Sequence, residues 1–253
     1  MLAHGAAPAE SGPDSLGSRN VSAIVAAGGA SSRMGSGASK SLVEINGVPL
    51  LMYSLMALER STTVSEIVLV ISKEDRERLD GCRDLPKISK LFSTILGGPQ
   101  REDSVQNGLN AVDPDAGIIL IHDAARPMLE PSWVDKAVNA LADYAGVIYG
   151  TPVTDTLKRM ERDGLVRETV PRQGLFAVQT PQVFASYWIR RAHDHRKAAG
   201  LAATDDAALV EMIGGEVKLL TGTRQNLKVT YPEDLETAAA LLRERAREWF
   251  GRE

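Results

Sequence analysis

Short apolar runs alternate with amphipathic stretches along most of the chain, and this alternation predicts its elements. Apolar runs of strand length lie at 21–27, 66–72, 92–96, 117–122, 145–151 and 216–221. Amphipathic stretches of helical length lie at 49–60, 74–80, 101–112, 131–143, 185–198, 205–213 and 232–250. Strands that alternate with helices are typical of an α/β fold, so we expect a mostly parallel sheet with helices on both faces.

The predicted sheet brings several loops of unusual composition to one edge. Right-handed crossovers between parallel strands place the carboxyl ends of the strands at the same edge, where ligands bind in such folds. The loop at Gly28, the pair Gly97-Gly98 and the pair His122-Asp123 each follow a predicted strand directly. We therefore expect these three loops to form one site.

The first loop belongs to a stretch that reads VSAIVAAGGASSRMGSGASK from Val21 to Lys40. Its small side chains let backbone N–H groups approach a ligand closely, while Arg33 and Lys40 favour a polyanion such as a nucleoside triphosphate. The spacing is not that of a P-loop, which needs glycines at Met34 and Ser39, nor that of the dinucleotide fingerprint. A plain connection between two elements is the other interpretation.

The second cluster, LIHDAARP at 120–127, places Asp123 at the end of an apolar strand. A carboxylate beside a triphosphate normally holds a divalent cation, so Asp123 is a candidate metal ligand. Capping of a turn is the alternative role for this carboxylate. Arg126 is a candidate partner of Asp123, and we expect His122 to be structural.

The third cluster, GGPQREDSVQNGL at 97–109, combines flexible glycines with Ser104 on a predicted first helical turn. Gly97-Gly98 would allow a base or a phosphate to approach closely. The charges of Arg101 and Asp103 are typical of a solvated helix start.

Two later clusters carry weaker signals. Thr204 and the two aspartates after it, in ATDDA at 203–207, form a good N-cap for the next helix. Lys228 lies in an extended piece, QNLKVTYPEDL at 225–235, where a lone lysine is ordinarily a surface residue.

The regular alternation breaks after Pro152. Residues 153–175 are polar, and Asp163-Gly164 signals a hairpin turn between two alternating runs. Such a hairpin cannot bury itself in its own domain. It is either an arm that docks on a second subunit or an exposed hairpin over the same subunit.

Composition limits the class of protein. A chain of 253 residues is long enough for one large domain, which we place at 20–250, after a disordered tail at 1–19. A formal net charge of −4 argues against a nucleic-acid binder, and no apolar run has the length of a membrane span. A single cysteine, Cys82, excludes a disulfide framework and favours a cytoplasmic protein.

Taken together, the clusters resemble the 2-C-methyl-D-erythritol 4-phosphate cytidylyltransferases. The matching motifs run in order from about Val21 to Leu242: AAG…RMG…K, GG…R..SV, HDAARP, DTLKR, QTPQVF, TDDA and NLKVTYPEDL. HDAARP with QTPQVF is the fairly specific part. The AAG…RMG opening is shared by many sugar-nucleotide and molybdopterin nucleotidyltransferases.

The resemblance implies a Rossmann-like fold of nucleotidyltransferase type and a homodimer formed through an exchanged β-arm. It implies transfer of CMP from CTP to 2-C-methyl-D-erythritol 4-phosphate, with Mg²⁺ as cofactor and pyrophosphate as the second product. This is a step of non-mevalonate isoprenoid biosynthesis.

The resemblance also implies roles for individual residues. The catalytic cations would be Arg33, Lys40 and Lys228. The nucleotide would lie against Ala26, Ala27, Gly28, Gly29, Gly98, Ser104, Asp123 and Ala124, with Asp123 as the metal ligand. The second substrate would contact Arg126 and Thr180 of one subunit, and Thr156, Arg172 and Thr204 from the partner's arm side.

Two departures and two alternatives accompany the resemblance. The loop GGASSRMG is one residue longer than the form AAG-x-G-x-R-M, and Pro99 has no N–H to offer a nucleobase. A cytidylyltransferase for another polyol phosphate, such as ribitol 5-phosphate, would have HDAVRPF instead of HDAARPM and would lack the DTLKR motif. A non-catalytic nucleotide-binding module is the other alternative, and the presence of Arg33, Lys40, Asp123 and Lys228 together argues against it.

Overall fold

The computed structural model describes residues 20–28, 40–81 and 85–252. The expected tail at 1–19 and Cys82 lie outside these residues. Every predicted strand and helix is present in the described part, with ends that agree to within two residues. The apolar and amphipathic pattern of the sequence was therefore sufficient to locate these elements.

A sheet of seven strands forms the centre of the molecule. Its order is β11 (Val217–Thr221), β7 (Gly146–Pro152), β10 (Phe176–Ala185), β6 (Ile118–Asp123), β1 (Val21–Ala26), β4 (Val64–Ile71) and β5 (Leu91–Leu96). All neighbours pair in parallel except β10, which is antiparallel to both β6 and β7. The expected mostly parallel sheet is confirmed.

Strand β10 corrects the sequence-based picture, which has no strand at these residues. Its buried half carries the polar side chains of Gln179, Thr180 and Gln182 around Pro181, and its register against β7 shifts between Gln179 and Gln182. A proline and buried polar groups break the alternation by which strands are recognised. Because β10 inserts between β6 and β7, its polar residues lie beside the end of β6.

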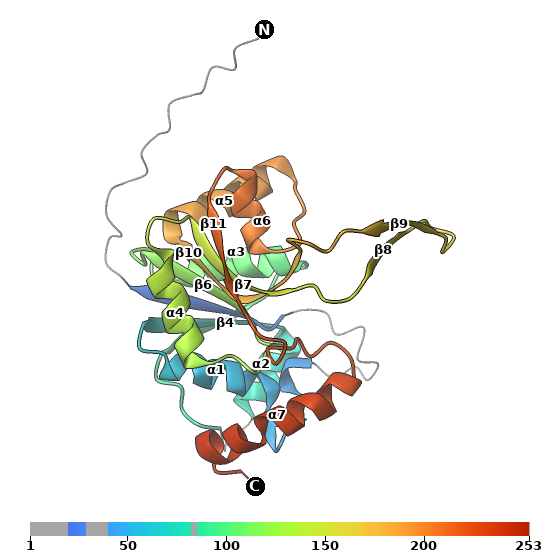
Figure 1. Cartoon of the computed structure of the whole chain (residues 1–253). Coiled ribbons are helices and arrows are strands. Elements are labelled where there is room, and N and C mark those ends of the chain that lie inside the picture. The colour runs from blue at the N-terminus through green and yellow to red at the C-terminus, as the bar shows by residue number, and fades with distance from the viewer. Residues whose placement is uncertain (1–19, 29–39, 82–84, 253) are drawn as a thin grey trace.

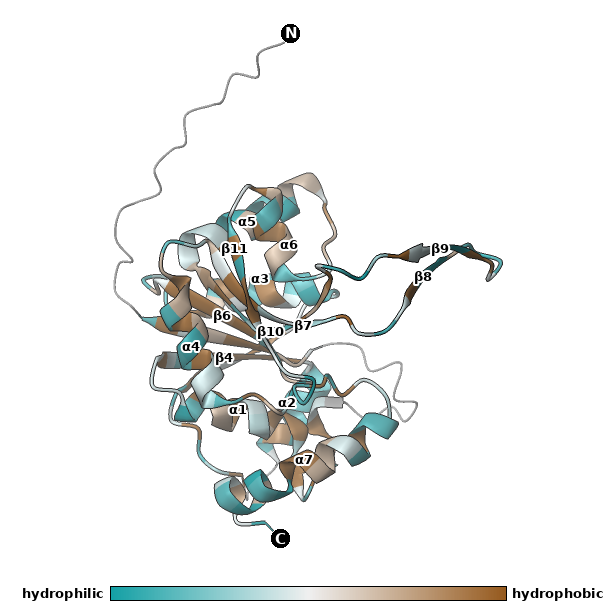
Figure 2. Cartoon of the chain, in the orientation of Figure 1, coloured by the Kyte–Doolittle hydropathy of each residue, from teal (hydrophilic) through white to brown (hydrophobic). Residues whose placement is uncertain are grey.

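Helices cover both faces of the sheet, as expected (Figure 1). One face is covered by α1 (Leu50–Arg60), α4 (Pro131–Leu141) and α7 (Glu233–Phe250), and the other by α3 (Arg101–Ala111), α5 (Ser186–Ala199) and α6 (Asp206–Met212). Along β1, Ala23 and Val25 join the first core cluster and Ile24 the second. Figure 2 shows the apolar strands enclosed between the two helical layers.

Smaller elements complete the described chain. They are the 3-10 helix η1 (Lys40–Leu42), the β2 (Glu44–Ile45) and β3 (Val48–Pro49) pair, and α2 (Lys73–Asp80). Among the described residues, no helix has both the length and the apolar character needed to cross a membrane.

The predicted hairpin is present and extends away from the body of the molecule (Figure 1). We call residues 153–175 the arm. Its strands β8 (Leu157–Met160) and β9 (Val166–Val170) form a two-stranded sheet of their own, and Gly164 adopts a positive φ of 88° at the turn. Nearly all arm residues are exposed, so this chain alone does not bury the arm.

Candidate active site

The loops after β1, β5 and β6 meet at one edge of the sheet, as expected from the topology. The Gly97 N–H donates to the Ile71 carbonyl at 3.0 Å, and the Ala124 N–H donates to the Ala26 carbonyl at 3.0 Å. A β-carbon at Gly28 would lie 3.6 Å from the Gly97 Cα. The small residues of the three loops are therefore neighbours in space.

Gly98 and Ser104 form one compact turn at the start of α3. The Ser104 hydroxyl accepts from the Gly98 N–H at 3.0 Å and donates to the Gln100 carbonyl at 3.1 Å. A β-carbon at Gly98 would lie 2.5 Å from the Cβ of Asp103, so the turn needs glycine there. The structure thus brings together Gly98 and Ser104, two of the residues that the sequence led us to expect against the nucleotide.

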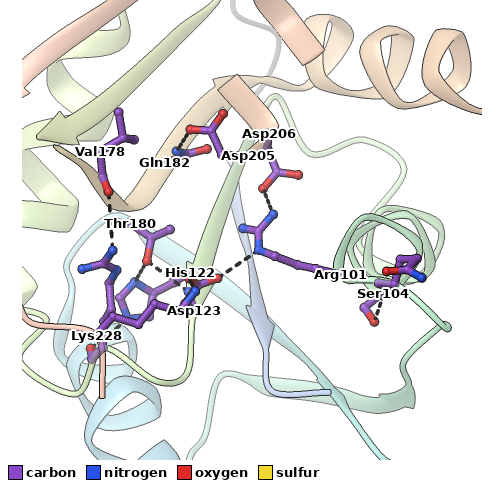
Figure 3. Close-up of polar contacts among 12 residues, drawn as sticks. Arg101, Ser104, His122, Asp123, Val178, Thr180, Gln182, Asp205, Asp206 and Lys228 are labelled. Carbon is purple, nitrogen blue, oxygen red and sulfur yellow. Dashed lines mark hydrogen bonds and ion pairs between the residues drawn. The ribbon is translucent and has the colours of Figure 1, made fainter. Parts of the chain in front are cut away.

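Asp123 is the centre of the charged groups at this edge (Figure 3). It ends β6, and its side chain is only 10% exposed. Oδ1 accepts from Arg101 Nε at 3.1 Å, and Oδ2 accepts from Lys228 Nζ at 2.6 Å. Burial would raise the pKa of Asp123, but the charges of Arg101 and Lys228 outweigh burial and hold the pKa well below its usual range. The carboxylate is therefore an anion at neutral pH.

Arg101 corrects an interpretation made from the sequence. It is not a solvated helix start, because its guanidinium also pairs with the buried carboxylate of Asp206, with Nη1 2.8 Å from Oδ2. Burial would lower the pKa of Arg101, but the two carboxylates raise it. Asp103, on the same helix, pairs with Arg196 of α5 at 2.6 Å. No local signal in the sequence identifies these partners, because they belong to other elements.

Arg126 is not the side-chain partner of Asp123 that the sequence suggested. Its guanidinium donates to the carbonyls of Asn226, at 2.8 Å, and Val178, at 3.5 Å. Its backbone N–H donates to the Asp123 carbonyl at 2.9 Å. Arg126 therefore ties the end of β6 to β10 and to the loop before α7, while Arg101 and Lys228 hold the carboxylate.

His122 is structural, as expected. It is fully buried, with Nε2 3.1 Å from the Arg126 carbonyl and Nδ1 3.1 Å from the Thr180 hydroxyl. Burial lowers the pKa of His122 to about 4, so the ring is neutral at neutral pH. A carbonyl only accepts, so Nε2 carries the proton and Nδ1 accepts from Thr180. The Thr180 oxygen in turn accepts from the Asp123 N–H at 3.1 Å.

A pocket of about 430 Å³ opens beside these groups. It is lined by Arg101, Asp123, Arg126, Ile148, Val178, Gln179, Thr180, Gln182, Thr204, Asp205, Ala208, Glu211 and Lys228. Thr204 was expected from the partner's side, but it lines the pocket of its own chain because α6 packs beside β7 and β11. Next to it, Asp205 caps α6 by accepting from the Ala208 N–H at 3.0 Å, as the sequence indicated.

The remaining predicted site residues lie in three places. Ala26 ends β1 and Ala27 follows it, at the same edge as Ala124. Thr156 and Arg172 do not line the pocket of their own chain; both are exposed in the arm, where Arg172 donates to the Thr154 carbonyl. Lys40 begins η1, but its side chain lies outside the described part, as do Gly29 and Arg33.

The carboxylate that β6 offers to a metal ion at this pocket is that of Asp123, the last residue of the strand. Within residues 20–28, 40–81 and 85–252, no three His, Cys, Asp or Glu side chains gather as in a protein-built metal centre. Mg²⁺ is often bound through one or two carboxylates plus substrate phosphates. Asp123 fits that donor chemistry if Lys228, whose side chain is 42% exposed, moves away from it.

Comparison with known proteins gives a consistent result. The family model described as IspD, 2-C-methyl-D-erythritol 4-phosphate cytidylyltransferase, matches residues 21–244. The enzyme of that name from Pelotomaculum thermopropionicum is 42% identical over 89% of this chain and 95% of its own length. Its counterpart from Geobacillus kaustophilus is 41% identical over 90% of this chain and 100% of its own.

Solved structures agree with this result. The 4-diphosphocytidyl-2C-methyl-D-erythritol synthase from Anaerococcus prevotii superposes with a TM-score of 0.76 at 30% identity, covering 88% of this chain and 98% of that one. The 2-C-methyl-D-erythritol 4-phosphate cytidylyltransferase from Thermus thermophilus gives 0.73 at 30% identity, covering 88% and 99%.

Proposed function

The chain belongs to the 2-C-methyl-D-erythritol 4-phosphate cytidylyltransferase family, and we propose that its pocket transfers CMP from CTP to that polyol phosphate. The products are 4-diphosphocytidyl-2-C-methyl-D-erythritol and pyrophosphate, in non-mevalonate isoprenoid biosynthesis. The observation that carries the proposal is the grouping of Lys228, Arg101 and Arg126 around a pocket beside the small-residue loops.

The reaction explains why the pocket needs cations. An oxygen of the substrate phosphate forms a bond to the α-phosphorus of CTP, while the bond from that phosphorus to the bridging oxygen breaks and pyrophosphate leaves. Both reactants are anions, and two unit charges 4 Å apart repel by about 4 kcal/mol at an intermediate dielectric. Positioned cations offset this repulsion and align the two reactants.

No general base is needed, because a phosphate oxygen is already a nucleophile near neutral pH. The histidine beside Asp123 supports that proposal, since His122 is buried, neutral and bonded at both ring nitrogens. Its role is to hold the Asp123 loop against β10 through Thr180.

Each end of CTP has candidate contacts. We assign the cytosine to Gly98 and Ser104, and the α-phosphate with the attacking phosphate to Lys228. The backbone of Ala26, Ala27, Gly28 and Ala124 would follow the nucleotide, and Gly29, Arg33 and Lys40 would meet the triphosphate. Arg126, Thr180 and Thr204 would surround the polyol phosphate.

Asp123 would hold Mg²⁺, which supplies further neutralisation of the triphosphate charge when bound. The requirement for Lys228 to leave Asp123 agrees with its assigned role, because a lysine released from the carboxylate can meet phosphate oxygens.

The arm supports a homodimer with shared sites. Met160, Leu165 and Val166 are apolar yet more than half exposed on the arm. Docking on a second copy would cover them and would bring Thr156 and Arg172 toward the partner's pocket, in a two-fold interface. We place the enzyme in the cytoplasm, on the ground of its single cysteine.

Purified protein incubated with CTP, Mg²⁺ and one polyol phosphate at a time tests the proposal. With 2-C-methyl-D-erythritol 4-phosphate, phosphorus NMR should show free pyrophosphate and a second product whose two phosphorus atoms are joined by a new phosphoanhydride bond. Faster turnover with ribitol 5-phosphate would favour the other polyol specificity. CTP binding without turnover on either substrate would favour a nucleotide-binding module.

A further inference from the structure

A buried carboxylate behind the pocket has no part in the proposed reaction. Asp206 lies on the first turn of α6, and its side chain is fully buried. Its Oδ1 lies 3.0 Å from Nε2 of His193, which is also fully buried, and its Oδ2 lies 2.8 Å from Nη1 of Arg101. Because Asp206 does not line the pocket, it can act on substrates only through Arg101.

Arg101 contacts two carboxylates that come from different elements, Asp123 at the end of β6 and Asp206 at the start of α6 (Figure 3). Its Nε donates to Asp123 and its Nη1 pairs with Asp206, so two points of one planar group are fixed. Lys228 holds the other oxygen of Asp123, but on a flexible side chain that is 42% exposed, against 26% for Arg101. The two cations of Asp123 therefore differ in how readily each can leave.

We infer that Arg101 is a positioning residue that stays on Asp123, held there by Asp206, so that Lys228 can leave Asp123 for the substrate phosphates. Without Arg101, the buried Asp123 carboxylate would rely on Lys228 as its close counter-ion, and losing that partner would leave a buried charge uncompensated. Lys228 would then remain on the carboxylate. The inference rests on the proposed assignment of Lys228 to phosphates.

The chain offers a matched control for this inference. Arg196 pairs with Asp103 at 2.6 Å and joins α5 to α3, close to the pair under test. It does not line the pocket, and its carboxylate partner is Asp103 rather than Asp123. Arg196→Gln removes an Arg–Asp pair of similar kind away from Asp123. It therefore shows how far CTP binding changes when such a pair is lost and Asp123 keeps both of its cations.

CTP binding measured by calorimetry in EDTA, without the second substrate, tests the inference apart from metal and turnover. Arg101→Gln should weaken CTP binding about fivefold or more, whereas Arg196→Gln should change it by less than about twofold. Asp123→Asn should strengthen CTP binding in both backgrounds, because it releases Lys228 from the carboxylate. The gain in affinity should be about threefold larger in the Arg101→Gln background than in the wild type.

Equal gains from Asp123→Asn in both backgrounds would overturn the inference, as would unchanged CTP binding in Arg101→Gln. If Arg101→Gln does not fold, Asp206→Asn replaces it in the same cycle and must show the same sign of coupling. A wild type that binds CTP but transfers no CMP would overturn the proposed function. The double-mutant cycle on CTP binding would still test the role of Arg101 in that case. A wild type that does not bind CTP would overturn both.

Discussion

The Nζ atom of Lys228 lies 2.6 Å from Oδ2 of Asp123, although the two residues are 105 positions apart in the chain. The pair joins the loop before α7 to the end of β6. It places a lysine beside the carboxylate at the pocket that the proposed reaction uses.

Lys228→Ala should reduce turnover more than tenfold with little loss of stability. A charge-assisted contact made in the transition state is worth about 2–4 kcal/mol, whereas a side chain 42% exposed contributes little to folding. Lys218→Ala is the control, because Lys218 lies on β11 and does not line the pocket. Its Nζ atom lies 4.8 Å from the centroid of the Tyr144 ring. Turnover of Lys228→Ala within about twofold of the wild type would remove the assigned role.

Asp123→Asn should shift the Mg²⁺ titration of activity to higher concentration. Asparagine keeps the shape of the side chain but loses the charge that a hard cation prefers. Asp194→Asn, an exposed change on α5, should leave the titration unchanged. Identical Mg²⁺ curves for Asp123→Asn and the wild type would mean that the carboxylate only pairs with cations of the protein.

His122 should make stability depend on pH in the acid range. Burial lowers the pKa of His122 from 6.5 to about 4 in the folded protein. Between these two pH values His122 therefore binds a proton in the unfolded chain but not in the folded one. Stability should therefore be complete above pH 6.5 and should fall as the pH drops toward 4, by up to about 1.4 kcal/mol per pH unit. The lowered pKa values of Asp123 and Asp206 act below this window.

Urea unfolding at several pH values measures this effect. The slope of stability against pH should be smaller in His122→Gln than in the wild type and should be retained in His195→Gln, which alters an exposed histidine on α5. Equal slopes in His122→Gln and the wild type would contradict the assignment.

Two inactive variants should complement each other if the arm is exchanged. Mixed Arg172→Ala and Asp123→Ala subunits would form heterodimers in which one of the two sites combines an intact arm with an intact pocket. Activity should recover to about a quarter of the wild type if subunits exchange at random. A mixture shown by tagged pull-down to exchange subunits, yet without activity, would exclude the shared site.

The sequence was informative wherever one strand or one loop carries the signal. The loop at Gly28, the Gly98 turn and Asp123 all follow apolar strands, so the topology of parallel sheets was enough to bring them together. It was least informative for β10, where Pro181 and buried polar side chains hide a strand.

Side-chain partners were the other part that the sequence could not predict. Arg101 has the pattern of an ordinary helix start, and Arg126 that of a neighbour of Asp123, because no local pattern reports contacts between distant elements. Their true partners depend on where α6 and β10 pack. Thr204 lines the pocket of its own chain because of where α6 packs, and no local pattern in the sequence reports that packing either.

The fate of a labelled phosphorus atom tests the central claim most directly. The enzyme is incubated with 2-C-methyl-D-erythritol 4-phosphate, Mg²⁺ and CTP labelled at either the α- or the γ-phosphorus. The account predicts that the α-label appears in the cytidylylated polyol and the γ-label in pyrophosphate. In Lys228→Ala, both labelled products should form at less than about a tenth of the wild-type rate. A γ-label in the polyol product, or no transfer of the α-label, would contradict it.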